Sequence, residues 1–169
     1  GIAICGLGAL DDLKGVRALY KLYVQLAVAS GAYFCGFQID AIHLPYVGVL
    51  EMGALAFPLT VAWIVGIINA LNLIDGLDGL AGGVALSACV VNIVVGLVSG
   101  NLLVTLLSVA LAGALLGFLF FNFNPATIFM GDSGSMFLGY VLATTSLLGA
   151  KGTTAVGLLV PVLAMGLPI

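Results

Sequence analysis

The segment LAGGVALSACVVNIVVGLVSGNLLVTLLSVALAGALLGFLFF, residues 80–121, contains no charged side chain. It divides near residues 99–101 into two apolar runs, 80–98 and 102–121, each close to the roughly 20 residues that a helix needs to cross a bilayer. Neither run alternates apolar and polar residues with a period of two, which favours helices over the strands of a membrane barrel. Inside hydrocarbon a helix also satisfies its own backbone hydrogen bonds.

The rest of the chain has the same character. Of its 169 residues, 63% are hydrophobic and 7% are charged, and the mean hydropathy of +1.32 is typical of integral membrane proteins. The other uncharged apolar segments are 1–10, 22–37, 54–68, 135–150 and 153–169. We therefore predict an all-α, polytopic transmembrane protein, with about six complete spans and the end of another, forming one membrane domain over residues 1–169. The chain starts inside an apolar run without Met, so we expect a fragment that is truncated at both ends.

If every segment crosses the bilayer, loops 11–21, 69–79 and 122–134 lie on one face, and loops 38–53, 99–101 and 151–152 lie on the other. The first face then carries five of the seven acidic residues, namely Asp11, Asp12, Asp75, Asp78 and Asp132. It also carries Lys14, Arg17 and Lys21, which by the positive-inside rule makes it cytoplasmic.

Residues outside these acidic loops receive structural interpretations. Loop 38–53 alternates polar and apolar residues and predicts a short hairpin, with His43 as a surface loop residue. Asn92, within an apolar segment, is interpreted as an interhelical hydrogen-bond partner. Gly113 and Gly117 form a GxxxG spacing, which predicts close packing of helices.

Three polar patches interrupt the apolar chain. In NALNLIDGLDGLAGG (69–83), polar residues recur every third position at Asn69, Asn72, Asp75 and Asp78. The glycines among them favour a kinked or unwound passage, which can aim all four side chains into one polar cavity. A solvated loop between two helices is the alternative.

The other two patches also combine acids with a helix end. Residues 8–25 contain the adjacent carboxylates Asp11 and Asp12, followed by basic residues, and a salt-bridged loop beside the membrane explains them as well. In residues 121–140, Asp132 opens a helix whose first N–H groups can bind an anion. The alternative is a helix cap supplied by Asp132 or Ser133.

Together the patches place carboxylates, amides and cations at one membrane face. Such oxygen ligands suit Mg²⁺ or Mn²⁺, and Mg²⁺ usually binds one or two carboxylates together with substrate phosphates. The patches therefore indicate metal-assisted phosphoryl transfer. No GxxxxGK[ST] motif is present, which disfavours a P-loop NTPase. A secondary transporter remains an alternative of another class, but it predicts acids spread through the bilayer depth or on both sides.

The phrases LGALDDLKGVRALYKLYVQ (7–25), NALNLIDGLDGLAGG and FNFNPATIFMGDSGSMFLG (121–139) resemble the polyprenyl-phosphate N-acetylhexosamine-1-phosphate transferases, glycosyltransferase family 4. The resemblance covers essentially the whole chain and is strongest to the undecaprenyl-phosphate N-acetylglucosamine-1-phosphate branch. The phospho-N-acetylmuramoyl-pentapeptide transferases of peptidoglycan synthesis are the nearest competitor.

The resemblance implies an Mg²⁺-dependent enzyme of the bacterial cytoplasmic (inner) membrane whose active site faces the cytoplasm. It would transfer N-acetylglucosamine 1-phosphate from a UDP-N-acetylhexosamine to undecaprenyl phosphate and release UMP, for envelope polymers such as teichoic acid or lipopolysaccharide. The lipid bilayer is then a partner, nucleic acid is not, and a homodimer is left open.

The resemblance also implies residue roles, carried over position by position. Asp132 matches the metal-binding aspartate. The expected catalytic residues are Asp11, Asp12, Asp75 and Asp78, and the expected substrate-binding residues are Lys21, Asn69, Asn72 and Asn122. Asp11 would position the lipid phosphate rather than remove a proton, because a phosphate monoester with a second pKa near 6 is already mostly dianionic.

Two departures from the family qualify this expectation. Gly15 stands where an extended DDxxD pattern would place a third acid. The family also carries a histidine-rich cytoplasmic loop that would follow residue 169, so we expect residues 1–169 alone to be inactive or to lack part of the sugar-nucleotide site.

Overall fold

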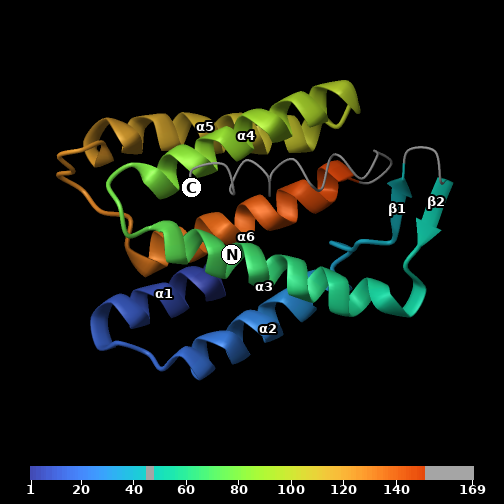
Figure 1. Ribbon diagram of the computed structural model, residues 1–169, viewed down its shortest axis with the longest axis horizontal. Coiled ribbons are helices and arrows are strands. Elements are labelled where there is room, and N and C mark those ends of the chain that lie inside the picture. Colours follow the sequence, from blue (N-terminus) through green and yellow to red (C-terminus); the bar gives the residue numbers. More distant parts are fainter. Residues whose placement is uncertain (45–47, 151–169) are drawn as a thin grey trace.

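The computed structural model describes residues 1–44 and 48–150, and these residues are almost entirely helical (Figure 1). The helices are α1 (Ile2–Lys14), α2 (Ala18–Phe34), α3 (Ala56–Ile74), α4 (Leu80–Val98), α5 (Leu102–Asn122) and α6 (Gly131–Ala150), with a 3₁₀ turn, η1 (Gly53–Leu55), before α3. Strands β1 (Ala41–Leu44) and β2 (Gly48–Glu51) pair antiparallel, with Ala41 opposite Glu51. The predicted all-α fold and the predicted hairpin are both confirmed.

Three helical stretches in the described part of the chain are long and apolar enough to cross a membrane: Gly53–Ile74, Leu80–Val98 and Leu102–Asn122. The expected spans at 22–37 and 135–150 are helical as α2 and α6, but these helices are shorter or less apolar than the other three. The expected span at 153–169 lies outside the described residues. The polytopic character is therefore confirmed, with three clear spans within residues 1–44 and 48–150.

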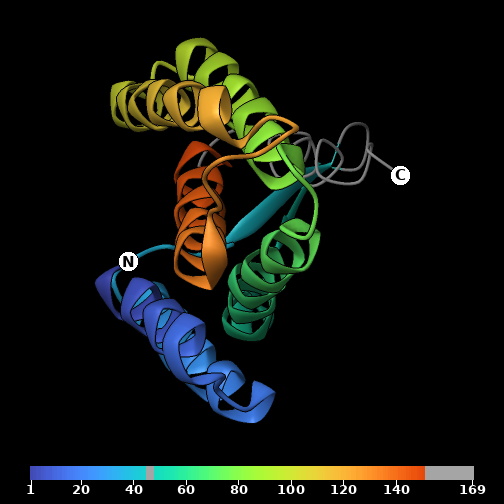
Figure 2. The ribbon, with the colours of Figure 1, turned by 90° about the vertical axis from the view of Figure 1, so that its left-hand side faces the viewer.

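Helix α6 lies in the middle of the bundle. It packs against α1 and α3 along much of their length and also contacts α4 and α5. Figure 2 shows α6 between the α4–α5 pair on one side and α1, α2 and α3 on the other. The position of α6 matters for function, because its first turn carries Asp132.

Glycines allow the backbones to approach closely along α6. A Cβ added to Gly139 would lie 2.7 Å from the Cα of Ile68 in α3, and one added to Gly8 in α1 would lie 2.3 Å from the Cα of Ser133. Real Cβ atoms do not approach other atoms so closely, so only glycine fits at either crossing. Apolar side chains such as Ile64 then fill the core around these crossings.

Two expectations about helix packing find no support among the described residues. Added Cβ atoms at Gly113 and Gly117 would meet nothing within 4 Å, so the GxxxG face of α5 packs against none of the described residues. The buried Nδ2 of Asn92 finds no hydrogen-bond partner there either, and neither does Ser108 Oγ across the α4–α5 pair. Sequence spacing and polarity identify small or polar residues within apolar helices, but they do not show which helix, if any, packs against those residues.

The loops separate at the two ends of the bundle, as the crossing count predicted. The ends of α1, α3 and α5 and the starts of α2, α4 and α6 lie together at the left of Figure 1. The hairpin and the turn between α4 and α5 lie at the opposite end. Five acidic side chains are therefore carried at one end of the helices rather than distributed through their length.

Candidate active site

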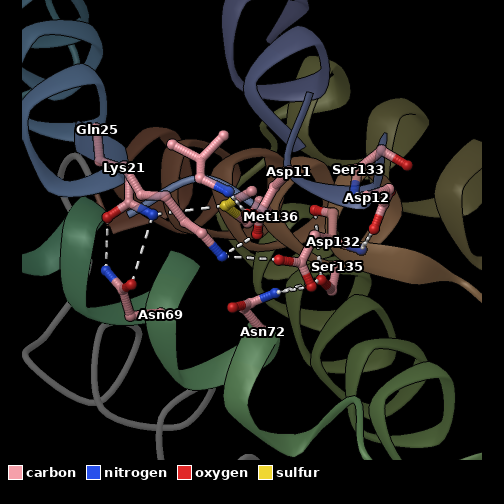
Figure 3. Close-up of polar contacts among 11 residues, drawn as sticks. Asp11, Asp12, Lys21, Gln25, Asn69, Asn72, Asp132, Ser133, Ser135 and Met136 are labelled. Carbon is pink, nitrogen blue, oxygen red and sulfur yellow. Dashed lines mark hydrogen bonds and ion pairs between the residues drawn. The ribbon is translucent and has the colours of Figure 1, made fainter. Parts of the chain in front are cut away.

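Lys21 joins two of the three polar patches. Its Nζ lies 2.8 Å from Asp132 Oδ2 and forms a second ion pair with Asp11 (Figure 3). Only 21% of the Lys21 side chain and 8% of the Asp11 side chain are exposed, so the ammonium group neutralises these carboxylates away from bulk water. The end of α1, the start of α2 and the start of α6 thus meet at one cation.

The local backbone prepares Asp11 for this contact. Helix α1 ends at Gly15, which adopts the left-handed conformation, and the chain turns back so that Val16 N–H donates to Asp11 Oδ1 at 2.6 Å. A hydrogen-bonded pairing with the Asp132 carboxyl, together with Lys21 and Val16, holds the pKa of Asp11 down to about 2. Asp11 is therefore a permanently charged group at neutral pH.

Asn72 fixes the other side of Asp132. Its Nδ2 donates to Asp132 Oδ1 at 3.0 Å and to Ser135 Oγ at 3.0 Å. Both Asp132 oxygens are thus held, one by an amide from α3 and one by an ammonium from α2. Ser135 is buried one turn into α6 and was not predicted from the sequence, where it stands among many small polar residues.

Asp12 points to a different partner from its neighbour. Its Oδ1 accepts from the backbone N–H of Asp132 at 2.8 Å, and its Oδ2 accepts from that of Ser133 at 3.1 Å. Burial alone would raise the pKa of Asp12, but the two N–H bonds outweigh it and hold the pKa below its ordinary value. The anion at the start of α6 is therefore a side chain of α1, and neither Asp132 nor Ser133 supplies this cap.

A cavity of about 200 Å³ opens beside Asp132. Its lining comes from the turn after α3, the end of α5 and the loop before α6, and consists of Asp75, Gly76, Leu77, Asp78, Asn122, Phe129, Met130, Gly131 and Asp132. Phe129 is 73% exposed, which presents an aromatic face at the cavity wall. Sequence reasoning did not single out Phe129, because nothing in the pattern distinguishes it from the lipid-facing aromatic residues.

Asp75, an acid of the cavity wall, has a strongly raised pKa. Partial burial raises it to about 6, and the negative charges of Asp132 and Asp12 act in the same direction. Ionised Asp75 is therefore repelled by Asp132 and Asp12, and a bound cation would relieve this repulsion.

Asp78 and Asn122 tie together the two loops that form the cavity. Asp78 Oδ2 accepts from Asn124 Nδ2 at 3.2 Å and from Ala126 N–H at 3.1 Å. Asn122 accepts from Gly79 N–H at 3.1 Å and donates to the carbonyl of Ile128 at 2.8 Å. These bonds hold the turn 75–79 against the loop 123–130, so both residues shape the cavity in addition to lining it.

The expectation that all four polar residues of 69–79 point into one cavity is wrong. Helix α3 continues without a break to Ile74, so Asn69 lies on another part of the helix surface. Its Nδ2 donates to Gln25 Oε1 at 2.7 Å, and Gln25 Nε2 returns a longer bond of 3.4 Å (Figure 3). Gln25, 1% exposed, was missed by sequence reasoning, although it is a lone amide in an apolar helix.

The donor set is suited to a divalent cation that shares its ligands with a substrate. Within the described ranges no group of three or more His, Cys, Asp or Glu side chains forms a ready cage for a metal. Asp132 and Asp75, which interact through their charges, would supply one or two carboxylate ligands. The remaining coordination positions would go to phosphate oxygens and water, as Mg²⁺ commonly requires. The repulsion between the carboxylates of Asp75 and Asp132 is consistent with this arrangement.

Comparisons with known proteins identify the family of the chain. The family profile described as Glycosyl transferase family 4 matches residues 1–150. A protein of Bacillus subtilis named "Probable undecaprenyl-phosphate N-acetylglucosaminyl 1-phosphate transferase" is 46% identical over 165 residues, which cover 96% of this chain and 46% of the relative.

Of two further relatives, one is named for a different lipid acceptor and the other for a different sugar-phosphate group. The decaprenyl-phosphate N-acetylglucosaminephosphotransferase of Mycobacterium tuberculosis is 42% identical over 93% of this chain and 40% of its own length. The phospho-N-acetylmuramoyl-pentapeptide-transferase of Clostridium botulinum is 38% identical over 87% of this chain and 49% of its own length.

The chain spans about half the length of the curated relatives that it matches. Within that half, the family match extends from α1 through α6 and includes every residue of the cluster around Lys21. On this evidence the chain belongs to glycosyl transferase family 4.

Proposed function

We propose that the full-length protein in which these residues occur transfers N-acetylglucosamine 1-phosphate from UDP-N-acetylglucosamine to undecaprenyl phosphate and releases UMP. The observation that carries the proposal is the Lys21 cluster, where an ammonium, a charged carboxylate and the proposed metal ligand Asp132 meet beside a cavity at one end of the helices. The names of the relatives in Bacillus and Mycobacterium support the same acceptor and donor classes.

In this proposal Lys21 binds the phosphate groups of the substrates. An ammonium with three donors can bond one phosphate oxygen while it keeps a carboxylate partner. The pKa of Lys21 is raised by its bonds to Asp11 and Asp132, which outweigh the opposing effect of burial, so the group stays protonated at neutral pH. It offers a fixed positive charge where two phosphate groups must approach each other.

The cavity suits the nucleotide part of the donor. Phe129 presents an exposed ring on which a planar base such as uracil can stack, and such stacking is worth about 1–3 kcal/mol. The cavity of about 200 Å³ would hold the base or the diphosphate but not the whole UDP-sugar, which fits a chain that spans half of its relatives.

Asp132, with Asp75 nearby, would hold Mg²⁺, or Mn²⁺ in its place. The metal supplies charge neutralisation of the pyrophosphate and of the departing UMP. Asn72 and Lys21 keep the Asp132 carboxylate in one orientation, so little reorganisation is needed when charge develops on the leaving group.

The reaction needs no base within the described cluster. An oxygen of the undecaprenyl phosphate dianion attacks the β-phosphorus of the UDP-sugar, and the bond between that phosphorus and the bridging oxygen breaks to release UMP. A carboxylate with a pKa of about 2 accepts protons poorly, so Asp11 orients the attacking group through Lys21 rather than deprotonating it.

The decisive experiment measures UMP release by the full-length protein in detergent with undecaprenyl phosphate, UDP-N-acetylglucosamine and Mg²⁺. Turnover that requires the lipid and is lost with EDTA supports the proposal. Faster turnover with UDP-N-acetylmuramoyl-pentapeptide would instead assign the protein to the peptidoglycan reaction. Light scattering of the same sample tests whether the protein is a homodimer.

We further propose that the protein is a multi-pass protein of the bacterial cytoplasmic membrane with the Lys21 cluster at the cytoplasmic surface. Lys14 and Arg17 lie at the same end of the helices as the cluster, and the positive-inside rule places them there. The UDP-sugar would then reach the cavity from the cytoplasm.

A further inference from the structure

The Asp12 carboxylate occupies the N-terminus of α6. The first N–H groups of any helix have no partner within the helix, and an oxygen side chain from the preceding residue usually caps them. Here Met130 precedes α6 and Gly131 begins it, and neither has an oxygen side chain. Both oxygens of Asp12, 120 residues earlier in the chain, accept the N–H groups of Asp132 and Ser133 instead.

Two glycines leave room for this contact. A Cβ on Gly131 would lie 3.0 Å from Asp12 Oδ2, and Gly131 has a positive φ of 67° that side chains rarely adopt. Gly8, one helical turn before Asp12, lets α1 approach the backbone of Ser133 directly. The contact is thus built from both helices.

The adjacent acids consequently face different partners. Successive residues of a helix point about 100° apart. Asp11 pairs with Lys21, which also binds the Asp132 side chain, while Asp12 bonds the backbone that carries that side chain (Figure 3).

We propose that Asp12 is a positioning residue, which fixes the first turn of α6 and so sets the place of the Asp132 carboxylate, and that it does not itself bind the metal or react. This inference rests on the proposed function, because it assigns Asp12 a task within that active site. Of the two adjacent acids, Asp11 would then act on the substrate through Lys21, and Asp12 would hold the first turn of α6 in place.

The test compares Asp12→Asn with Asp12→Ala, in the full-length protein, for UMP release. Asn keeps one acceptor oxygen and loses the charge, while Ala removes both bonds. A positioning role predicts that Asp12→Asn retains kcat within about tenfold and that Asp12→Ala loses about 100-fold, since a misplacement near 1 Å has effects of that size.

The matched control is the neighbouring pair Asp11→Asn and Asp11→Ala. Asp11 acts through its charge, so both variants should lose activity to a similar extent. Equal losses in Asp12→Asn and Asp12→Ala would mean that the Asp12 charge itself is needed, and that result would overturn the positioning role.

Hydrogen exchange gives a readout that is independent of turnover. In Asp12→Ala the amides of Asp132 and Ser133 should exchange about tenfold faster than in the wild type, with a smaller change in Asp12→Asn and none in Asp11→Ala. Unchanged exchange in Asp12→Ala would contradict the cap. If the wild type shows no transferase activity, the proposed function fails, but exchange still decides whether Asp12 caps α6.

Discussion

At the scale of single residues, Lys21 has the largest predicted effect. Lys21→Gln removes one charge-assisted hydrogen bond to a phosphate and leaves the Asp11 and Asp132 carboxylates without their shared cation. Hydrogen bonds to charged groups are worth about 1.5–3 kcal/mol, so kcat/KM should fall by roughly 10- to 150-fold.

Steady-state kinetics with both substrates varied will measure this loss. Lys14→Gln, which removes a cation from the last turn of α1 within the same polar patch, serves as the control for net charge. A loss of similar size in Lys14→Gln would show that general electrostatic attraction, not the Lys21 contact, is responsible.

The raised pKa of Asp75 predicts that the stability of the fold depends on pH. Its pKa is raised to about 6 in the fold, from 3.8 in the unfolded chain, so the folded state holds the proton more tightly and the ionised group destabilises it. The destabilisation is absent below about pH 4, grows through pH 6 and is complete above it. Asp75→Asn removes the charge, so it should raise the melting temperature by a few degrees at pH 8 and not at pH 4.

Thermal unfolding in detergent with EDTA at both pH values checks this prediction, because a bound cation would itself relieve the charge. Asp40→Asn is the control, since Asp40 is exposed and lies outside the cavity. An equal rise in melting temperature at pH 4 and pH 8 would mean that Asp75→Asn stabilises the fold through packing and not through the loss of a charge.

The sequence predicted the polar residues of the site better than their roles. The acids and amides of the three patches could be identified because they are rare in an apolar chain. Their partners could not, since Asn69 pairs with Gln25 and Asp12 with the start of α6 across 44 and 120 residues of sequence. Such pairings depend on helix crossings, which the sequence alone does not define.

At the scale of helices, the close crossing of α3 and α6 predicts sensitivity to one methyl group. Gly139→Ala would force Ile68 away, because the new Cβ would lie 2.7 Å from its Cα and 3.1 Å from the carbonyl oxygen of Ile67. Overpacking of this kind is destabilising by about 1–3 kcal/mol. The melting temperature should fall, and activity should fall with it, since α6 carries Asp132.

Gly117→Ala in α5 is the matched control. An added Cβ there meets nothing within 4 Å of the described residues, and Ala is favoured over Gly in a helix interior by about 1 kcal/mol. The melting temperature should stay the same or rise. A drop as large as that of Gly139→Ala would indicate that the GxxxG face of α5 packs against a partner after all.

At the scale of the whole molecule, the two ends of the bundle should be reached from opposite sides of the membrane. Thr127 lies in an exposed loop at the end of the Lys21 cluster, and Ser99 lies in the turn at the other end. In a background where Cys5, Cys35 and Cys89 are replaced, Thr127→Cys should react with an impermeant maleimide only after the cells are opened. Ser99→Cys should react in intact spheroplasts.

Labelling of both positions from the same side would contradict the crossing count. The reverse labelling pattern would agree with the number of crossings but would place the Lys21 cluster on the outer side of the membrane. The fold class needed no such test, because continuous apolar segments leave a membrane chain little choice but helices. The boundaries of the helices were less predictable: α3 includes Asn69 and Asn72, which the sequence assigned to a loop.

The contact between Asp12 and α6 also orders events during synthesis. Asp12 leaves the ribosome 120 residues before its partners, which at 5–20 residues per second is a delay of roughly 6–24 s. Throughout that time the Gly8 surface of α1 has no α6 to pack against, although α1 to α5 can already insert as separate helices. The nascent chain can therefore complete the contact between its first and last described helices only after α6 has been made.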